Sequence, residues 1–217
     1  MDLEAIFLSL ELALWTIVLI IPLGIWVAHS LIQLDKSRAW CEAALALPLV
    51  LPPTVLGYYL LVGLAGKDFL GIPLVFSFTG ILIASLIVNL PFAIQPIQRA
   101  FEAIPPEIRE AAQVSGLSKW QVFRLIELPL AWRGIISAAV LTFAHTLGEF
   151  GVILMVGGAI PGETKTASIA IYDKVQGFDS AGAGALSLLL LTISLLAIAI
   201  SYGVFGRHSQ STIGERR

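Results

Sequence analysis

Five long stretches of this 217-residue chain contain almost no charged side chains, and they constrain its fold more than any other feature. A helix that crosses a membrane needs about 20 mostly apolar residues. Charged residues make up only 13% of the chain, against about 25% in an ordinary soluble domain. We therefore predict an all-α, polytopic membrane helix bundle that forms a single domain over residues 1–217. The predicted spans are residues 12–34, 43–66, 77–98, 134–156 and 185–206.

The basic residues between these stretches predict how the chain is oriented. Three of the 13 Lys and Arg residues fall on one side of the membrane, namely Lys67, Lys165 and Lys174. The other ten are Lys36 and Arg38, five residues between positions 99 and 133, and Arg207, Arg216 and Arg217. Because basic residues favour cytoplasmic loops, we expect the N-terminus to lie outside the cell and the C-terminus in the cytoplasm.

The predicted cytoplasmic loop at residues 99–133 is long and has the pattern of two short helices. Pro106 suits the first position of a helix, and Gly116 suits its C-terminal end. Ser118 and Gln121 match a capping box for a second helix, which should end before Pro129. On these features alone, two interpretations stay open: the loop binds a groove of another protein, or it rests on the bilayer surface.

The residue order within this loop narrows the choice. It reads Glu-Ala-Ala, three residues, Gly, nine residues, Ile, one residue, Leu-Pro, at Glu110, Ala111, Ala112, Gly116, Ile126, Leu128 and Pro129. This order resembles the EAA motif of ABC importer permeases. The resemblance implies a fold like that of type I importer permeases, with these seven residues coupling the chain to a cytoplasmic ATPase. Within the motif, it implies that Glu110, Ala111, Ala112 and Gly116 dock on that ATPase.

Three further segments resemble molybdate permeases in particular. They are residues 47–58, which include Pro52-Pro53, residues 147–151, which read Leu-Gly-Glu-Phe-Gly, and residues 160–172. The resemblance implies a multi-pass permease of the bacterial cell membrane that imports molybdate as a homodimer. Its implied partners are a cytoplasmic ABC ATPase and an external substrate-binding protein. Permeases for tungstate or sulfate remain alternatives, since they are close relatives.

Glu149 is the only formal charge inside a predicted span. Ionisable residues in the membrane are costly and usually functional. His145 lies four residues earlier and shares a helix face with it, at a position where relatives commonly carry Arg. The pair is either a functional polar element beside the pathway or a structural contact between helices. The residues that we expect at the pathway or gate are Pro52, Pro53, His145, Gly148, Glu149, Phe150 and Gly151.

Other polar or helix-breaking residues in the spans have less specific interpretations. Prolines 48, 52 and 53 predict a broken or bent second span. Asn89, near Pro91, either lines a cavity or accompanies an ordinary kink. His29 lies near the cytoplasmic end of the first span, and we interpret it as interfacial.

Several other classes of function are disfavoured. An ion-coupled secondary transporter could use Glu149 and His145, but the spans show no inverted repeat. An intramembrane enzyme would need a nucleophile–base pair or several metal ligands, so we predict no catalytic, metal or cofactor site. The segment Gly157–Gly162 has the glycine spacing of a P-loop but lacks its Lys, which leaves ATP hydrolysis to a partner. No stripe of Lys and Arg residues indicates a nucleic-acid partner. We expect lipid to surround the chain. Because the spans carry no Lys or Arg, we expect an external binding protein to select the anion.

Overall fold

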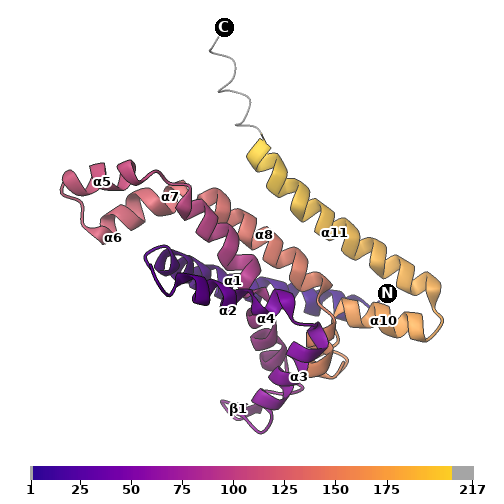
Figure 1. The fold of residues 1–217 in the computed structure, drawn as a ribbon. Helices are drawn as coiled ribbons and strands as arrows, with labels where there is room; N and C mark the ends of the chain where they lie inside the picture. Colours follow the sequence, from indigo (N-terminus) through magenta and orange to yellow (C-terminus); the bar gives the residue numbers. More distant parts are fainter. Residues whose placement is uncertain (1, 207–217) are drawn as a thin grey trace.

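The computed structural model describes residues 2–206 and is almost entirely helical (Figure 1). A short antiparallel hairpin of β1 (Asp68–Phe69) and β2 (Ile72–Pro73) is its only sheet within the described residues. The longer helices are α1 (Leu3–Leu31), α2 (Arg38–Val50), α3 (Pro53–Leu64), α4 (Phe78–Glu102), α8 (Trp132–Gly148) and α11 (Ser180–Gly206). The shorter ones are α5 (Pro106–Val114), α6 (Lys119–Val122), the π-helical turn η1 (Phe123–Glu127), α7 (Leu128–Leu130), α9 (Gly151–Gly157) and α10 (Ala167–Gln176).

Three helices of the described residues, α1, α4 and α11, are long and apolar enough to cross a membrane. Two bent helix pairs raise this to as many as five spans. One pair is α2 with α3, bent by 106°, and the other is residues 119–130 with α8, bent by 64°. This architecture confirms the prediction of an all-α polytopic bundle with about five transmembrane helices.

Two helices begin earlier in the chain than the predicted spans do. Helix α1 begins at Leu3, ahead of residue 12, and Glu4 lies in its first turn. A carboxylate there interacts favourably with the helix dipole, so the helix can start before the apolar stretch does. Helix α11 begins at Ser180, ahead of residue 185. The basic residues of the C-terminal tail, Arg207, Arg216 and Arg217, lie outside the described residues.

Two of the predicted spans are interrupted. Leu51 and Pro52 have extended backbone between α2 and α3, and Pro53 occupies the first turn of α3, as the prolines of this span predict. A second interruption separates α8 from α9, where Glu149 is extended, and no proline marks it. Proline alone does not break a helix in this chain, because Pro91 and Pro96 lie inside the continuous α4.

Helix α4 forms the centre of the bundle and α11 its edge. In the most apolar segment of each helix, 56% of α4 is buried against 11% of α11, which runs along the outside of the bundle (Figure 1). Helices α1 and α8 both pack on α4. At Gly134 of α8, an added Cβ would lie 2.7 Å from the carbonyl oxygen of Pro96. Glycine therefore permits the two backbones to approach closely there.

Candidate coupling loop and membrane cavity

The predicted cytoplasmic loop is an ordered pair of short helices joined at Gly116. Helix α5 ends in a Schellman motif, in which the N–H groups of Gly116 and Leu117 donate to the carbonyls of Gln113 and Ala112, at 2.9 and 3.2 Å. Gly116 has φ +86°, a conformation that favours glycine. A complete capping box between Ser118 and Gln121 then starts α6. The local backbone conformation that ends α5 thus explains why glycine occupies this position of the EAA motif.

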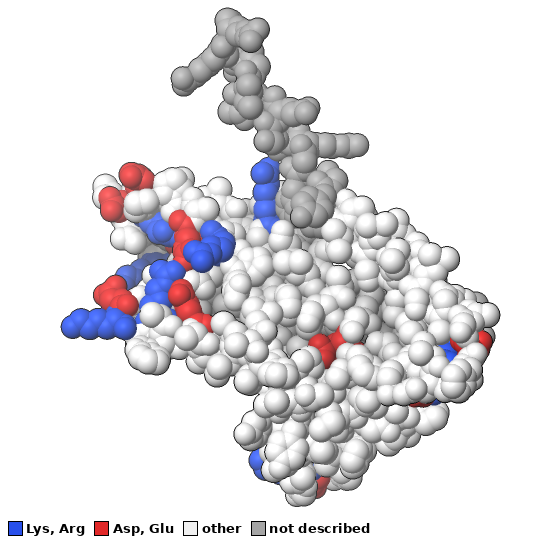
Figure 2. Space-filling model, turned by 45° about the vertical axis from the view of Figure 1, so that its right-hand side comes forward, with Lys and Arg blue, Asp and Glu red and all other residues white. Residues whose placement is uncertain are grey.

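The seven EAA-motif residues do not share one environment. Glu110, Ala111, Gly116 and Pro129 are exposed, whereas Ile126 and Leu128 are half-buried. Ala112 is buried at 7% exposure, so its methyl group faces the protein. Lys, Arg, Asp and Glu gather over this end of the molecule, while most of the adjoining surface is uncharged (Figure 2). The exposed part of the motif therefore lies within the charged end of the chain.

In the membrane region, the two interrupted spans meet around one cavity of about 160 Å³. Leu51 and Pro53 line it from the α2–α3 break, and Glu149 lines it from the α8–α9 break. His145 and Phe92 complete the polar and aromatic part of its wall. A water molecule occupies about 30 Å³ in the liquid, so the cavity has room for several. The structure thus brings Pro53, His145 and Glu149 together from distant parts of the sequence.

The side chains of His145 and Glu149 are each held by further contacts. The Nδ1 atom of His145 donates to Oδ1 of Asn89 at 3.2 Å, and its ring stacks on Phe92 with centroids 4.0 Å apart. Its Nε2 lies 3.7 Å from Oε2 of Glu149, beyond hydrogen-bond distance. The other carboxylate oxygen, Oε1, accepts from the N–H of Val152 at 3.4 Å, within the first turn of α9. Both groups are therefore fixed at the cavity wall.

A chain of hydrogen bonds extends from this wall across three helices. Asn89 Nδ2 donates to Oγ1 of Thr146 at 3.1 Å and to the carbonyl of Ser85 at 2.8 Å. The hydroxyl of Ser85 lies 2.9 Å from that of Thr16 in α1. Asn89 is thus more than an ordinary kink residue, because it joins α1, α4 and α8 to the cavity.

Two glycines bring α9 close to α3. A Cβ at Gly151 would lie 2.9 Å from Cβ of Pro53, and one at Gly57 would lie 2.8 Å from Cβ of Met155. Gly148, in contrast, has open space around the position of a Cβ. Phe150 packs against Tyr172 of α10, with ring centroids 4.9 Å apart. Of the pathway residues predicted from the sequence, Gly151 and Pro53 are thus in direct contact, whereas Gly148 is not confined.

One cluster of charged and polar side chains in the loop was not predicted from the sequence. Glu127, between Ile126 and the Leu-Pro of the motif, is 5% exposed and contacts Arg109 and His29. The signal that could have found it is an acidic residue flanked by apolar ones in an amphipathic helix. His29 is also more than an interfacial residue, since it forms part of this cluster. No group of three or more potential metal ligands occurs within residues 2–206.

Comparison with known proteins agrees with these features. A family model described as "Binding-protein-dependent transport system inner membrane component" matches residues 20–213. A molybdenum transport system permease protein of Azotobacter vinelandii is 44% identical over 93% of each chain. The corresponding protein of Escherichia coli K12 is 35% identical over 91% of each chain.

A solved structure supports the fold at lower sequence similarity. A bacterial ABC transporter involved in the import of the acidic polysaccharide alginate has a chain that matches with a TM-score of 0.77. The match covers 96% of this chain and 80% of that one, at 20% identity. Fold and sequence lead to one assignment: this chain belongs to the family of inner membrane components of binding-protein-dependent transport systems, and is thus a multi-pass permease.

Proposed function

We propose that this chain is the permease subunit of an ATP-driven importer of molybdate, and that it forms the translocation pathway while a partner subunit hydrolyses ATP. The likeness to two molybdenum transport permeases over 91–93% of the chain carries this proposal. Membership of a binding-protein-dependent family supplies the two implied partners, an ATPase and a substrate-binding protein. Because the spans lack fixed positive charge, the binding protein selects the anion and the permease passes it on.

The coupling loop is the proposed contact with the ATPase. Glu110, Ala111 and Gly116 are exposed at the charged end of the molecule, which suits docking on a soluble subunit. Ala112 contributes by packing inward, where a small side chain keeps α5 close to the protein. Ile126, Leu128 and Pro129 belong to the helix that carries the loop back toward α8.

The proposed pathway runs beside the cavity between the two interrupted spans. Non-helical backbone within a membrane is tolerated where it lines a cavity or is buried in protein. Leu51 and Pro52, just before Pro53, provide one such stretch, and Glu149 and Phe150, between Gly148 and Gly151, provide the other. In this proposal they act as a gate, and His145 and Glu149 are its polar groups.

Orientation and assembly are proposed on independent grounds. The excess of basic residues on one side supports a cytoplasmic C-terminus. No residue of α2 and only Gly57 of α3 is buried. This bent helix pair is therefore largely uncovered in a single chain and suits contact with a second copy.

Accessibility of single cysteines tests the orientation. In a Cys41→Ser background, Lys67→Cys should react with an impermeant maleimide in intact cells, and Lys119→Cys only after permeabilisation. The reverse pattern would refute the orientation, and a complex mass that fits one permease copy would refute the homodimer.

The decisive test is uptake of labelled molybdate by proteoliposomes that contain the chain, its ATPase and its binding protein. We expect ATP-dependent uptake that excess sulfate does not suppress. Competition by excess tungstate measures how well the transporter distinguishes molybdate from tungstate. Suppression by sulfate would instead assign a sulfate permease. Failure to import any oxyanion, in a complex that hydrolyses ATP, would reject the substrate proposal.

A further inference from the structure

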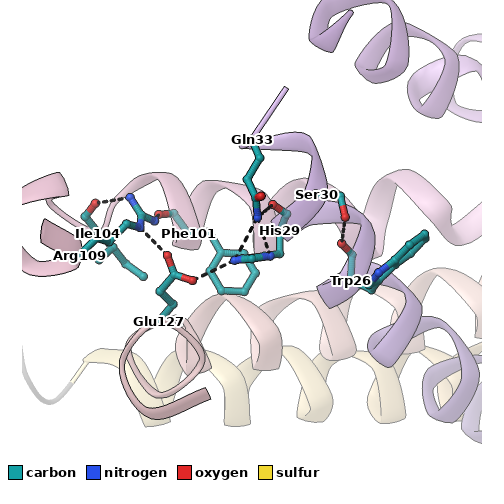
Figure 3. Close-up of polar contacts among 8 residues, drawn as sticks. All are labelled: Trp26, His29, Ser30, Gln33, Phe101, Ile104, Arg109 and Glu127. Atoms are coloured by element: carbon teal, nitrogen blue, oxygen red, sulfur yellow. Dashed lines mark hydrogen bonds and ion pairs between the residues drawn. The ribbon is translucent and has the colours of Figure 1, made fainter. Parts of the chain in front are cut away.

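A buried carboxylate in the coupling loop joins three separate elements (Figure 3). Oε1 of Glu127 accepts from Nε of Arg109, in α5, at 2.5 Å. Its Oε2 accepts from Nε2 of His29, in the last turn of α1, at 2.9 Å. The Glu127 side chain is only 7% exposed. Both of its oxygens are therefore used within the protein, and they connect residues 98 and 18 positions away.

Arg109 extends this connection to α4. Its Nη2 donates to the carbonyl of Phe101 at 2.7 Å, and its Nη1 donates to the carbonyl of Ile104 at 3.2 Å. Phe101 is in the last turn of α4 and Ile104 lies two residues beyond its end. Carbonyls at the end of a helix lack the usual i+4 partner, and Arg109 donates to both of these. The planar guanidinium can serve both carbonyls and the carboxylate at once, which a lysine could not do.

His29 is held by several contacts. Its Nδ1 accepts from Nε2 of Gln33 at 3.0 Å, which leaves the Nε2 proton for the carboxylate. Its ring contacts both Phe101 of α4 and Phe123 of η1, with centroid distances of 5.6 and 4.5 Å. The imidazole is thus held by α1, α4 and the coupling loop together.

The loop backbone is locally modified where it presents the carboxylate. Phe123–Glu127 forms a π-helical turn, closed by the N–H of Leu128 donating to the carbonyl of Phe123. Such turns contain one extra residue and are frequent at functional sites. Arg124 and Leu125 of the same turn are exposed, whereas Glu127 is buried. The turn thus directs one acidic side chain into the protein while two of its neighbours face outward.

We propose that Arg109, Glu127 and His29 are positioning residues that clamp the coupling loop to the cytoplasmic ends of α1 and α4. The inference rests on the proposed function, since it explains how a displacement of the loop by the ATPase reaches the gate. Helix α4 is continuous from Phe101 at the clamp to Phe92 at the cavity wall, about 14 Å along its axis. Without the clamp, the loop moves on its ATPase while α1 and α4 do not follow.

The test uses Glu127→Gln in the reconstituted complex and two measurements. The first is the number of anions imported per ATP hydrolysed, and the second is deuterium exchange of the α5 amides in the permease–ATPase complex. We expect the transport ratio to fall and the exchange to accelerate, each by about tenfold, the effect of losing one charge-assisted contact. Glu127→Asp keeps the charge and should recover part of both.

Glu102→Gln is the matched control. Glu102 pairs with Arg38 and Arg99 at the same end of α4, so the substitution breaks ion pairs there but leaves the loop clamp intact. We expect its transport ratio and its α5 exchange to match the wild type. An equal loss in Glu102→Gln would overturn the proposal, as would unchanged values in Glu127→Gln.

A second variant tests the clamp if Glu127→Gln does not accumulate in the membrane. Arg109→Lys keeps the charge opposite Glu127 but loses the contacts to both carbonyls, and we expect it to accelerate α5 exchange by severalfold. Wild-type exchange in Arg109→Lys would count against the clamp. Because amide exchange needs no substrate, it tests the clamp even if the wild-type complex fails to import molybdate, an outcome that would reject the proposed function alone.

Discussion

Glu110→Lys should reduce ATP-dependent uptake to the background level while the chain still inserts into the membrane. Glu110 is an exposed carboxylate in the coupling loop, so reversing its charge leaves the fold intact. At an interface, a like-charge contact costs several kcal/mol, and a loss of about 3 kcal/mol would weaken docking more than a hundredfold. Uptake by proteoliposomes, together with ATP hydrolysis and the amount of complex recovered, measures the effect.

Glu107→Lys provides the control for this prediction. Glu107 is also exposed in α5, in its first turn, and its reversal costs about 0.3–1 kcal/mol through the helix dipole. We expect its uptake to stay within about twofold of the wild type, since it lies outside the motif. Normal coupled uptake by Glu110→Lys would remove the docking role from this residue.

Gly151→Ala should both destabilise the chain and impair transport. The added Cβ would lie 2.9 Å from Cβ of Pro53, which forces α9 and α3 apart at the proposed gate. Overpacking of this kind costs about 1–3 kcal/mol, which lowers the melting temperature of a chain of this size by roughly 2–10 °C. Thermal unfolding in detergent and uptake at a matched protein level measure the two effects.

Gly148→Ala is the contrasting substitution in the same motif. A Cβ there meets no atom within 4 Å, and alanine is favoured over glycine in a helix by about 0.5–1 kcal/mol. We expect wild-type transport and an equal or higher melting temperature. If Gly151→Ala and Gly148→Ala behaved alike, the close approach of α3 and α9 would not matter to the gate.

The sequence predicted features that depend on local chemistry. The end of α5 at Gly116 and the start of α6 at Ser118 follow from capping rules that involve a few neighbouring residues. The break at Pro52-Pro53 also follows from the missing N–H groups of proline. The family resemblance followed from the EAA residues in the same way, because the motif lies within one segment of the chain, residues 110–129.

Features that depend on distant partners were not predictable. The break at Glu149 carries no proline, and it becomes intelligible only with Pro53 of α3 packed against Gly151. The role of His29 could not be read from its surroundings in the sequence, because its carboxylate partner lies 98 residues away. The i, i+4 spacing of His145 and Glu149 predicted their proximity, but not that Asn89 of α4 would hold the imidazole.

The two interrupted spans also set a condition on how the chain meets lipid. Backbone N–H and C=O groups released from a helix cannot face hydrocarbon, since each unsatisfied group there costs several kcal/mol. The protein itself meets this condition at both breaks. The carbonyl of Pro52 accepts from the N–H groups of Val55 and Leu56, at 2.9 and 3.1 Å, and the carbonyl of Glu149 accepts from Oγ of Ser168 at 2.6 Å. The interruptions therefore leave no need for water at these carbonyls, and lipid can lie against the exposed apolar side chains of α1 and α11.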